Sequence, residues 1–166
     1  MDEICRPAGV HQGSFSQCFP SKQGLVLAVL AMSGQPIRDL WKAGRLPPAG
    51  ALPASVCMVR AARAADSWMG APLGNLALEL GSQDPVMRQK LHAMFTAWAC
   101  GIERGWREAM ASGALPTLDP GTTAQTVVAY FEGVMMWAKT QNTPELITRL
   151  AHGAVALVEA AAGAAL

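Results

Sequence analysis

The sequence predicts an all-α fold, with a helix-turn-helix segment near its start and a bundle of longer helices in the rest of the chain. Between Met87 and Met110, apolar residues recur at spacings of three and four, which is the period of one buried helix face. A helix start signal, an N-cap oxygen followed by proline, occurs three times, at Asp84-Pro85, Asp119-Pro120 and Thr143-Pro144. Alternating patterns that predict strands are nearly absent.

The chain is expected to contain two domains, over residues 1–32 and 33–166. A helix is predicted from Ser21 to about Ala43, with a kink or break near Pro36 because proline removes a backbone donor and crowds the preceding turn. The Pro/Gly-rich stretch RLPPAGALPA that follows is predicted to be a loop.

Five helices are predicted after this loop. The first covers residues 54–69, the second is the short stretch PLGNLALELG, and the third is the long amphipathic helix that ends before Gly113. The last two follow Asp119-Pro120 and Thr143-Pro144, and the short link TQNTP predicts that they form an antiparallel hairpin.

This hairpin is apolar over a wide arc, which suits packing against a second copy of the chain. We therefore expect a homodimer. The predicted interface residues are apolar positions of the two helices, namely Val127, Phe131, Val134, Leu150, Leu157 and Val158. The alternative is that the hairpin only closes the core of its own chain.

The composition narrows the class of protein. Of the 166 residues, 51% are hydrophobic and 15% charged, so much apolar surface must be buried inside the fold or against a partner. No segment has about 18 consecutive apolar residues, and MDEICRP lacks the features of a signal peptide, so we expect a cytoplasmic protein without a membrane partner. The net charge of +1 excludes a wholly basic nucleic-acid coat.

The stretch PAGVHQGSFSQCF has the pattern of a helix-turn-helix corner. Ala8 is small enough for two helices to cross closely, Gly9 can adopt a positive φ, and Val10 is expected to fill the angle between the helices. In the segment over residues 12–18, Phe15 and the nearby Phe19 are expected to point inward. The polar side chains on the other face of this segment are expected to be exposed, and small polar side chains on an exposed helix can contact base edges in a major groove.

Together, AGV, GSF and FPSK make DEICRPAGVHQGSFSQCFPSKQGLVLAVL resemble the TetR family of bacterial transcriptional regulators, from their second helix into their fourth. LGNLALELGSQDPVMRQKL, WREAMASGALP and EGVMMWAKTQNTPEL also resemble the C-terminal region of one TetR subgroup. The resemblance implies a homodimer of all-helical subunits that reads a palindromic double-stranded DNA operator. It also implies a small-molecule pocket whose occupancy releases the DNA.

Residue by residue, the resemblance assigns DNA contacts to six positions, His11, Gln12, Ser14, Ser16, Gln17 and Lys22. Ser16 stands where the family usually has a tyrosine that contacts phosphate, and Pro7 stands where it usually has alanine. The family's first helix would precede Met1. We expect a start assigned too late, so that upstream coding residues would raise thermal stability. The alternative is a dimeric effector-binding protein that has lost DNA binding.

The pocket is predicted to hold a small apolar or aromatic effector. Its expected lining consists of adaptable methionines and stacking aromatics, namely Met58, Trp68, Met69, Met94, Trp98, Met135 and Trp137. The alternative for each of these side chains is ordinary core packing.

No enzyme, cofactor or metal site is predicted. The sequence lacks a GxSxG elbow, an HExxH pair and a P-loop, and its four cysteines and three histidines show no metal-ligand spacing. Four glutamates lie on helix patterns, and the sequence singles out none of them as a tuned acid: Glu79, Glu103, Glu108 and Glu132.

Overall fold

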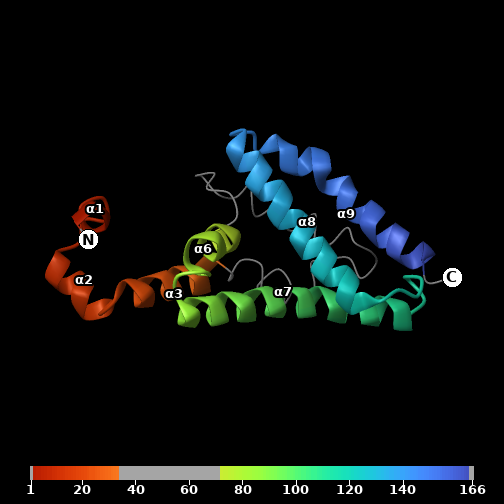
Figure 1. Ribbon diagram of the computed structural model, residues 1–166, viewed down its shortest axis with the longest axis horizontal. Helices are drawn as coiled ribbons and strands as arrows, with labels where there is room; N and C mark the ends of the chain where they lie inside the picture. The colour runs from red at the N-terminus through yellow and green to blue at the C-terminus, as the bar shows by residue number, and fades with distance from the viewer. Residues whose placement is uncertain (1, 34–71, 165–166) are drawn as a thin grey trace. The chain divides into compact units, whose positions relative to one another are not determined.

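The computed structural model describes residues 2–33 and 72–164, and this part of the chain is all-helical, as predicted (Figure 1). Its helices in chain order are α1 (Asp2–Cys5), α2 (Gln12–Cys18), α3 (Lys22–Ser33), α6 (Pro72–Leu80), α7 (Pro85–Ala111), α8 (Pro120–Thr140) and α9 (Glu145–Gly163). The chain divides into two compact units, Met1–Gln35 and Pro36–Leu166. The predictions for residues 34–71, including the break near Pro36 and the helix over 54–69, lie outside the described residues.

The predicted signals set both ends of α7. The side-chain Oδ1 of Asp84 accepts hydrogen bonds from the backbone N–H groups of Val86 (2.9 Å) and Met87 (3.1 Å), which satisfies two of the free donors at the helix start. Beyond the other end, Gly113 has a φ of +74°, a conformation that favours glycine. Both end signals predicted for this helix are confirmed.

The two later start signals behave differently. Asp119 caps α8 as predicted, because its Oδ1 accepts from the N–H groups of Gly121 (3.1 Å) and Thr122 (3.4 Å). Thr143 does not cap α9, and its hydroxyl donates instead to the Gln141 carbonyl at 3.0 Å. In the first turn of α9, the backbone N–H groups of Leu146 and Ile147 donate to the Thr143 and Pro144 carbonyls, at 3.1 Å each.

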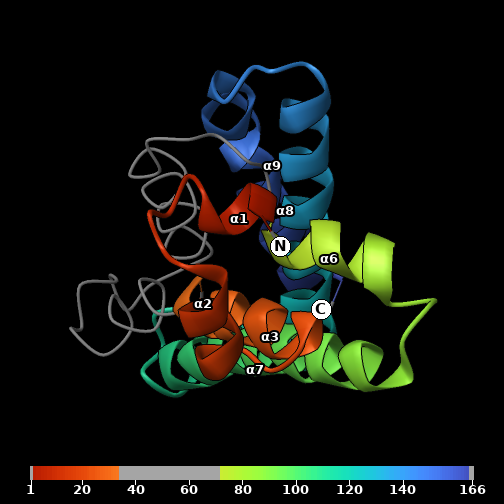
Figure 2. The ribbon, with the colours of Figure 1, turned by 90° about the vertical axis from the view of Figure 1, so that its left-hand side faces the viewer.

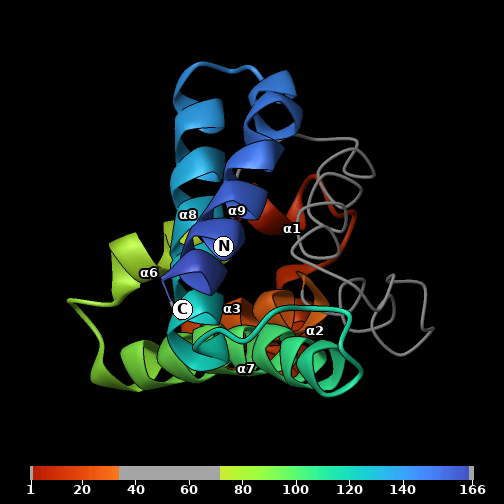
Figure 3. The same cartoon turned by 90° about the vertical axis from the view of Figure 1, so that its right-hand side faces the viewer.

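The larger unit is a hairpin of α8 and α9 with α7 packed against it, and α6 lies against α7 (Figures 2 and 3). Its main core combines buried side chains of the three long helices and the loop before α8, including Ile102, Trp106, Leu118, Val128, Phe131, Ala154 and Val158. A second cluster near the α8–α9 turn contains Val134, Ala138, Leu146 and Ile147. Full burial of one large apolar side chain contributes about 1.5 to 3 kcal/mol, so these clusters hold the helices together.

The predicted dimer-interface residues include four that lie inside this core. Val127, Phe131, Val134 and Val158 are all at most 5% exposed within a single chain. Their side chains are already covered by neighbouring helices of the same chain, so they are core residues and cannot form the surface that meets a partner. Leu150 and Leu157 are half-buried. The hairpin was predicted correctly, and the burial of these four residues matches the alternative that the hairpin closes the core of its own chain.

By length and composition alone, α9 is the one described helix that could cross a membrane. Its apolar character has another explanation in the fold, because Leu146, Ile147, Ala154 and Val158 face the core. The opposite side of α9 carries Arg149, His152 and Glu159, all of them exposed. This is the pattern of a surface helix that packs on one side.

Candidate functional site

The turn between α1 and α2 has the backbone predicted for a helix-turn-helix corner. Gly9 adopts a φ of +65°, and the N–H of Val10 donates to the Cys5 carbonyl at 3.1 Å. Val10, however, is 44% exposed, and Ala8 is also exposed. The buried side chains of the described part of this unit are Cys5 and Phe15, and Val10 does not join them as predicted.

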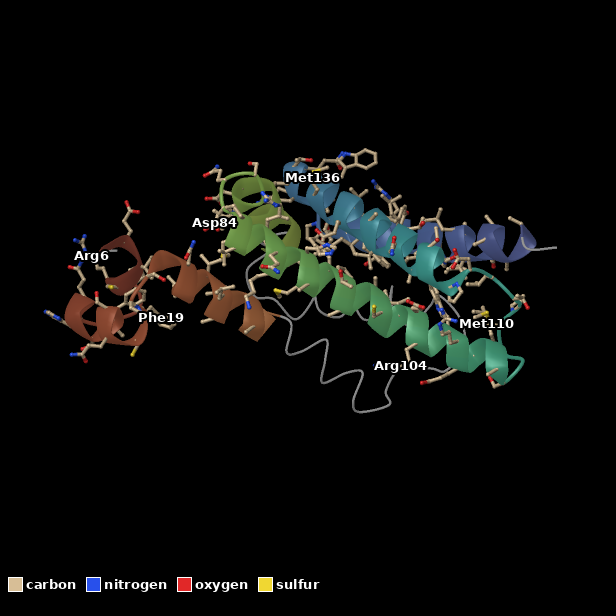
Figure 4. All side chains as sticks on the ribbon, turned by 60° about the horizontal axis from the view of Figure 1, so that its bottom comes forward. Arg6, Phe19, Asp84, Arg104, Met110 and Met136 are labelled. Carbon is tan, nitrogen blue, oxygen red and sulfur yellow. The ribbon has the colours of Figure 1, made fainter. Side chains whose placement is uncertain are left out.

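The inner side of α2 is aromatic, as predicted. Phe15 is buried, Phe19 is half-buried, and their ring centroids lie 5.3 Å apart at an interplanar angle of 46°. Figure 4 shows Phe19 at the end of α2 and Arg6 beside α1. The aromatic pair holds one face of this short helix and leaves the other face to solvent.

The outer side of α2 carries the predicted DNA-contacting side chains. All are exposed: His11, Gln12, Ser14, Ser16 and Gln17. His11 also has a role that the sequence analysis missed, because its Nδ1 accepts a hydrogen bond from the Gly13 N–H at 3.2 Å and so caps α2. Histidine in place of the more common Ser, Thr, Asp or Asn hides this signal.

At the start of α3, the hydroxyl oxygen of Ser21 accepts from the Gly24 N–H at 3.0 Å. Lys22 is the first residue of α3, and its side chain lies outside the described residues. The predicted phosphate-contacting lysine therefore stands at a capped helix N-terminus, where free N–H groups and the helix dipole favour an anion.

In the larger unit, the structure brings together only some of the predicted pocket residues. Trp98 and Met135 both pack, half-buried, against the main core, and Met94 is half-buried on α7. Trp137 is 54% exposed, because its position on α8 is more than half a helical turn away from Met135. Trp137 is therefore a surface residue of this unit. Met58, Trp68 and Met69 lie outside the described residues.

Of the four glutamates on helix patterns, the structure singles out Glu132 on α8. Burial raises the pKa of its carboxyl from 4.5 to about 7. Within the described ranges, no side chain forms an ion pair or hydrogen bond with it. Glu132 is the one acidic residue of α8, which was the available sequence signal, but the sequence did not show which face of the helix it occupies.

Charged side chains of α7 lie near the start of α8. Glu103 accepts two hydrogen bonds from Arg107, at 3.0 Å and 2.6 Å, and its carboxyl lies near Gly121. The pKa of Asp119 is lowered, mainly by the hydrogen bond of the Thr122 side chain. Among the described residues, no group of His, Cys, Asp or Glu has the arrangement of a metal site.

An all-helical chain with a helix-turn-helix unit and a separate helical unit has the architecture of a helix-turn-helix transcriptional regulator. Residues 56–154 match the family model of the tetracyclin repressor-like C-terminal domain. The chain therefore belongs to the TetR family of transcriptional regulators, which confirms the resemblance found in the sequence.

Two similar proteins agree with this assignment. The transcriptional regulator AcuR of Cereibacter sphaeroides is 27% identical over a match of 151 residues that covers 87% of this chain and 69% of AcuR. The crystal structure of a TetR transcriptional regulator from Chloroflexus aurantiacus J-10-fl matches with a TM-score of 0.76 and 20% identity. That match covers 95% of this chain and 82% of the other, and it shows a shared fold.

Proposed function

We propose that this chain is a ligand-responsive repressor that acts in the cytoplasm as a homodimer on a palindromic operator and carries out no catalysis. The observation that carries the proposal is α2, whose aromatic side is held inside the unit while its polar side faces solvent. Such a helix presents side chains to the major groove of double-stranded DNA.

The exposed side chains of α2 are chemically suited to reading DNA. The amides of Gln12 and Gln17 can donate to and accept from an adenine edge at the same time, and the hydroxyl of Ser14 can bond to bases or phosphates. The capped start of α3, with Lys22 as its first residue, is suited to holding one phosphate beside the groove. Base readout and backbone positioning would thus come from adjacent helices.

The outward face of α8 supports a homodimer. Its exposed residues from Thr122 to Trp137 carry no charge, and they include the small residues Ala129 and Gly133. Met136 and Trp137 are both more than half exposed, and Met136 lies near the end of α8 (Figure 4). Small residues let two helices approach closely, and large exposed apolar side chains favour a partner of the same kind.

The effector site is proposed for the larger unit, near Trp98, Met135 and Met94. These half-buried side chains combine an aromatic surface with flexible thioethers, which suits an apolar or aromatic molecule. An effector in this site would favour the conformational state that binds DNA less tightly. The equilibrium between the two states can shift only by as much as the effector's binding free energies for them differ.

A second candidate is a dimeric effector-binding protein without DNA affinity. Ser16 favours it, because serine on α2 supplies neither the ring nor the long reach of the tyrosine usual in the family. The exposed Ile4 and Val10 also favour it, because they leave the apolar surface of the small unit partly uncovered.

The two candidates are separated by fluorescence anisotropy with labelled duplexes from the region flanking the gene and with shuffled duplexes of equal composition. The repressor proposal predicts tighter binding to one flanking duplex, with affinity that falls as salt rises from about 50 to about 200 mM, because phosphate contacts release counterions. Dimerisation and ligand binding without any preference between duplexes would instead support the second candidate.

A further inference from the structure

The side chain of His11 holds the first turn of α2. Its Nδ1 accepts a hydrogen bond from the Gly13 N–H at 3.2 Å. A Cβ on Gly13 would lie 3.4 Å from the same Nδ1 and 3.9 Å from Cε1, so the imidazole ring lies directly against this glycine. His11 therefore satisfies one of the N–H groups that the start of a helix leaves without a backbone acceptor.

The first turn of α2 has few other stabilising features. The N–H of Phe15 donates to the His11 carbonyl at 3.0 Å, but the turn contains no acidic side chain to favour the helix dipole. Gly13 also loses more conformational freedom on ordering than any other residue type would. Gln12 and Ser14, which are proposed to contact the DNA, flank Gly13. Their positions therefore depend on the hydrogen bond between His11 and Gly13.

An imidazole can accept this hydrogen bond in one form only. The neutral ring with its proton on Nε2 has a free lone pair on Nδ1, whereas the protonated ring carries a proton on both nitrogens and can only donate. A positive charge is also unfavourable beside a helix N-terminus. Histidine is the side chain whose ordinary charge change falls between about pH 5 and 8. The cap is thus available above this range and is lost as the ring gains its second proton.

Within the described part of the small unit, no ion pair competes for the imidazole. Helix α1 packs against α2, and α3 follows it. The other ionisable side chains of residues 2–33 are two acids, two bases and two thiols, namely Asp2, Glu3, Cys5, Arg6, Cys18 and Lys22. None of those that the structure describes forms a hydrogen bond or an ion pair with His11. Protonation of the ring therefore acts on the bond to Gly13 and breaks no salt bridge.

We propose that His11 is the positioning residue of α2 and makes the reading of DNA sequence by this helix sensitive to acid. The neutral ring keeps Gln12 and Ser14 in place against the base edges, and protonation releases the turn that carries them. The charge of the protonated ring attracts phosphates, but this attraction is independent of sequence and acts on every duplex alike. The preference for one duplex over another therefore reports the cap. The inference rests on the proposed operator-binding function.

The test measures the affinity of the full chain for the preferred flanking duplex and for its shuffled form by fluorescence anisotropy, at about pH 8 and about pH 5.5. The ratio of the two affinities should fall at least about threefold at the lower pH, as expected from the loss of one helix cap. His11→Ser supplies a cap that does not titrate, and His11→Ala supplies none. The ratio for His11→Ser should exceed that for His11→Ala and should not change with pH.

The matched control is His92→Gln, which removes an exposed histidine of α7 and should lose its preference at low pH as the parent chain does. A parent ratio that does not change with pH overturns the inference. A fall that persists in His11→Ser also overturns it, because the titrating group is then another one. So does a ratio for His11→Ser no higher than that for His11→Ala, because the cap then contributes nothing to the preference.

Nuclear magnetic resonance of the free chain separates this inference from the proposed function. At about pH 8 the His11 ring should carry its proton on Nε2, and the Gly13 amide resonance should move as the pH falls in the parent chain but not in His11→Ser. A proton on Nδ1, or a Gly13 resonance that does not move, overturns the inference while operator binding stands. If the resonances behave as expected but the parent chain prefers neither duplex, the cap is confirmed. The operator-binding function is then overturned, and with it the effect on DNA reading.

Discussion

The hydroxyl of Tyr130 on α8 donates a hydrogen bond to the backbone carbonyl of Leu150 on α9 at 2.7 Å. The ring reaches α9 because Gly153, about one turn further along, has no side chain there. A Cβ on Gly153 would overlap the Tyr130 hydroxyl and ring. This contact fixes how the two helices of the hairpin lie against each other.

Removal of the hydroxyl should weaken the hairpin. Tyr130→Phe keeps the ring packing but removes the donor to the Leu150 carbonyl, so the free energy of unfolding should fall by about 1 kcal/mol. Urea unfolding followed by circular dichroism measures the change. A variant as stable as the parent chain would show that this hydrogen bond contributes nothing net.

Gly153→Ala should destabilise the protein, although alanine favours helices by about 1 kcal/mol over glycine. The overlap with Tyr130 forces the helices apart and should cost about 1 to 3 kcal/mol in excess of that gain. Gly101→Ala on α7 is the control, because a Cβ there meets no atom within 4 Å and should stabilise the helix. Stabilisation by both substitutions would contradict the packing described here.

Stability should depend on pH through Glu132. Its pKa is 4.5 as a free group and about 7 in the fold, so between these values the folded state binds a proton that the unfolded chain has lost. The contribution of Glu132 to stability is therefore fully present below about pH 4.5 and is lost, by about 3 kcal/mol, as the pH rises from there through about 7. Urea unfolding of Glu132→Gln across the same range should lack this loss. If the free energy of unfolding changes with pH in the same way in the parent chain and in Glu132→Gln, the fold does not raise the pKa of Glu132.

A charge on the outer face of α8 should split the proposed dimer. Ala129→Glu places a carboxylate in the uncharged stripe of this helix, where two copies would bring like charges together without partners. Sedimentation velocity should show twice the chain mass of 17.4 kDa for the parent and a single chain for the variant. Ala93→Glu, on an exposed position of α7, should remain dimeric. A monomeric parent chain would refute the dimer itself.

The sequence was most informative where a local rule decides the structure. Asp84-Pro85 and Asp119-Pro120 predicted two helix starts, and Gly9 and Gly113 predicted two positive φ angles, because caps and turns depend on a few adjacent residues. Thr143 does not cap α9: the N–H of Leu146 donates to the backbone carbonyl of Thr143, and the Thr143 hydroxyl donates to the Gln141 carbonyl.

The assignment of faces could not be read from the sequence in the same way. Between Val127 and Ala138, helix α8 is apolar almost all round, so hydrophobicity alone did not separate the buried Val127 from the exposed Trp137. Only the positions of α7 and α9 decide which side is covered. The same contacts decide that Glu132 lies half-buried, which is why its carboxyl could not be singled out among four glutamates.

The most direct test of the account is whether α2 reads DNA sequence. The measurement is fluorescence anisotropy of the parent chain and of a Gln12→Ala, Gln17→Ala variant on the preferred flanking duplex and its shuffled form, with Gln89→Ala on α7 as control. The variant should lose the preference of the parent chain, by about 1 to 3 kcal/mol for each lost base contact, but keep salt-dependent binding to both duplexes. An unchanged preference in the variant, or no preference in the parent chain, would contradict the claim that this helix recognises an operator.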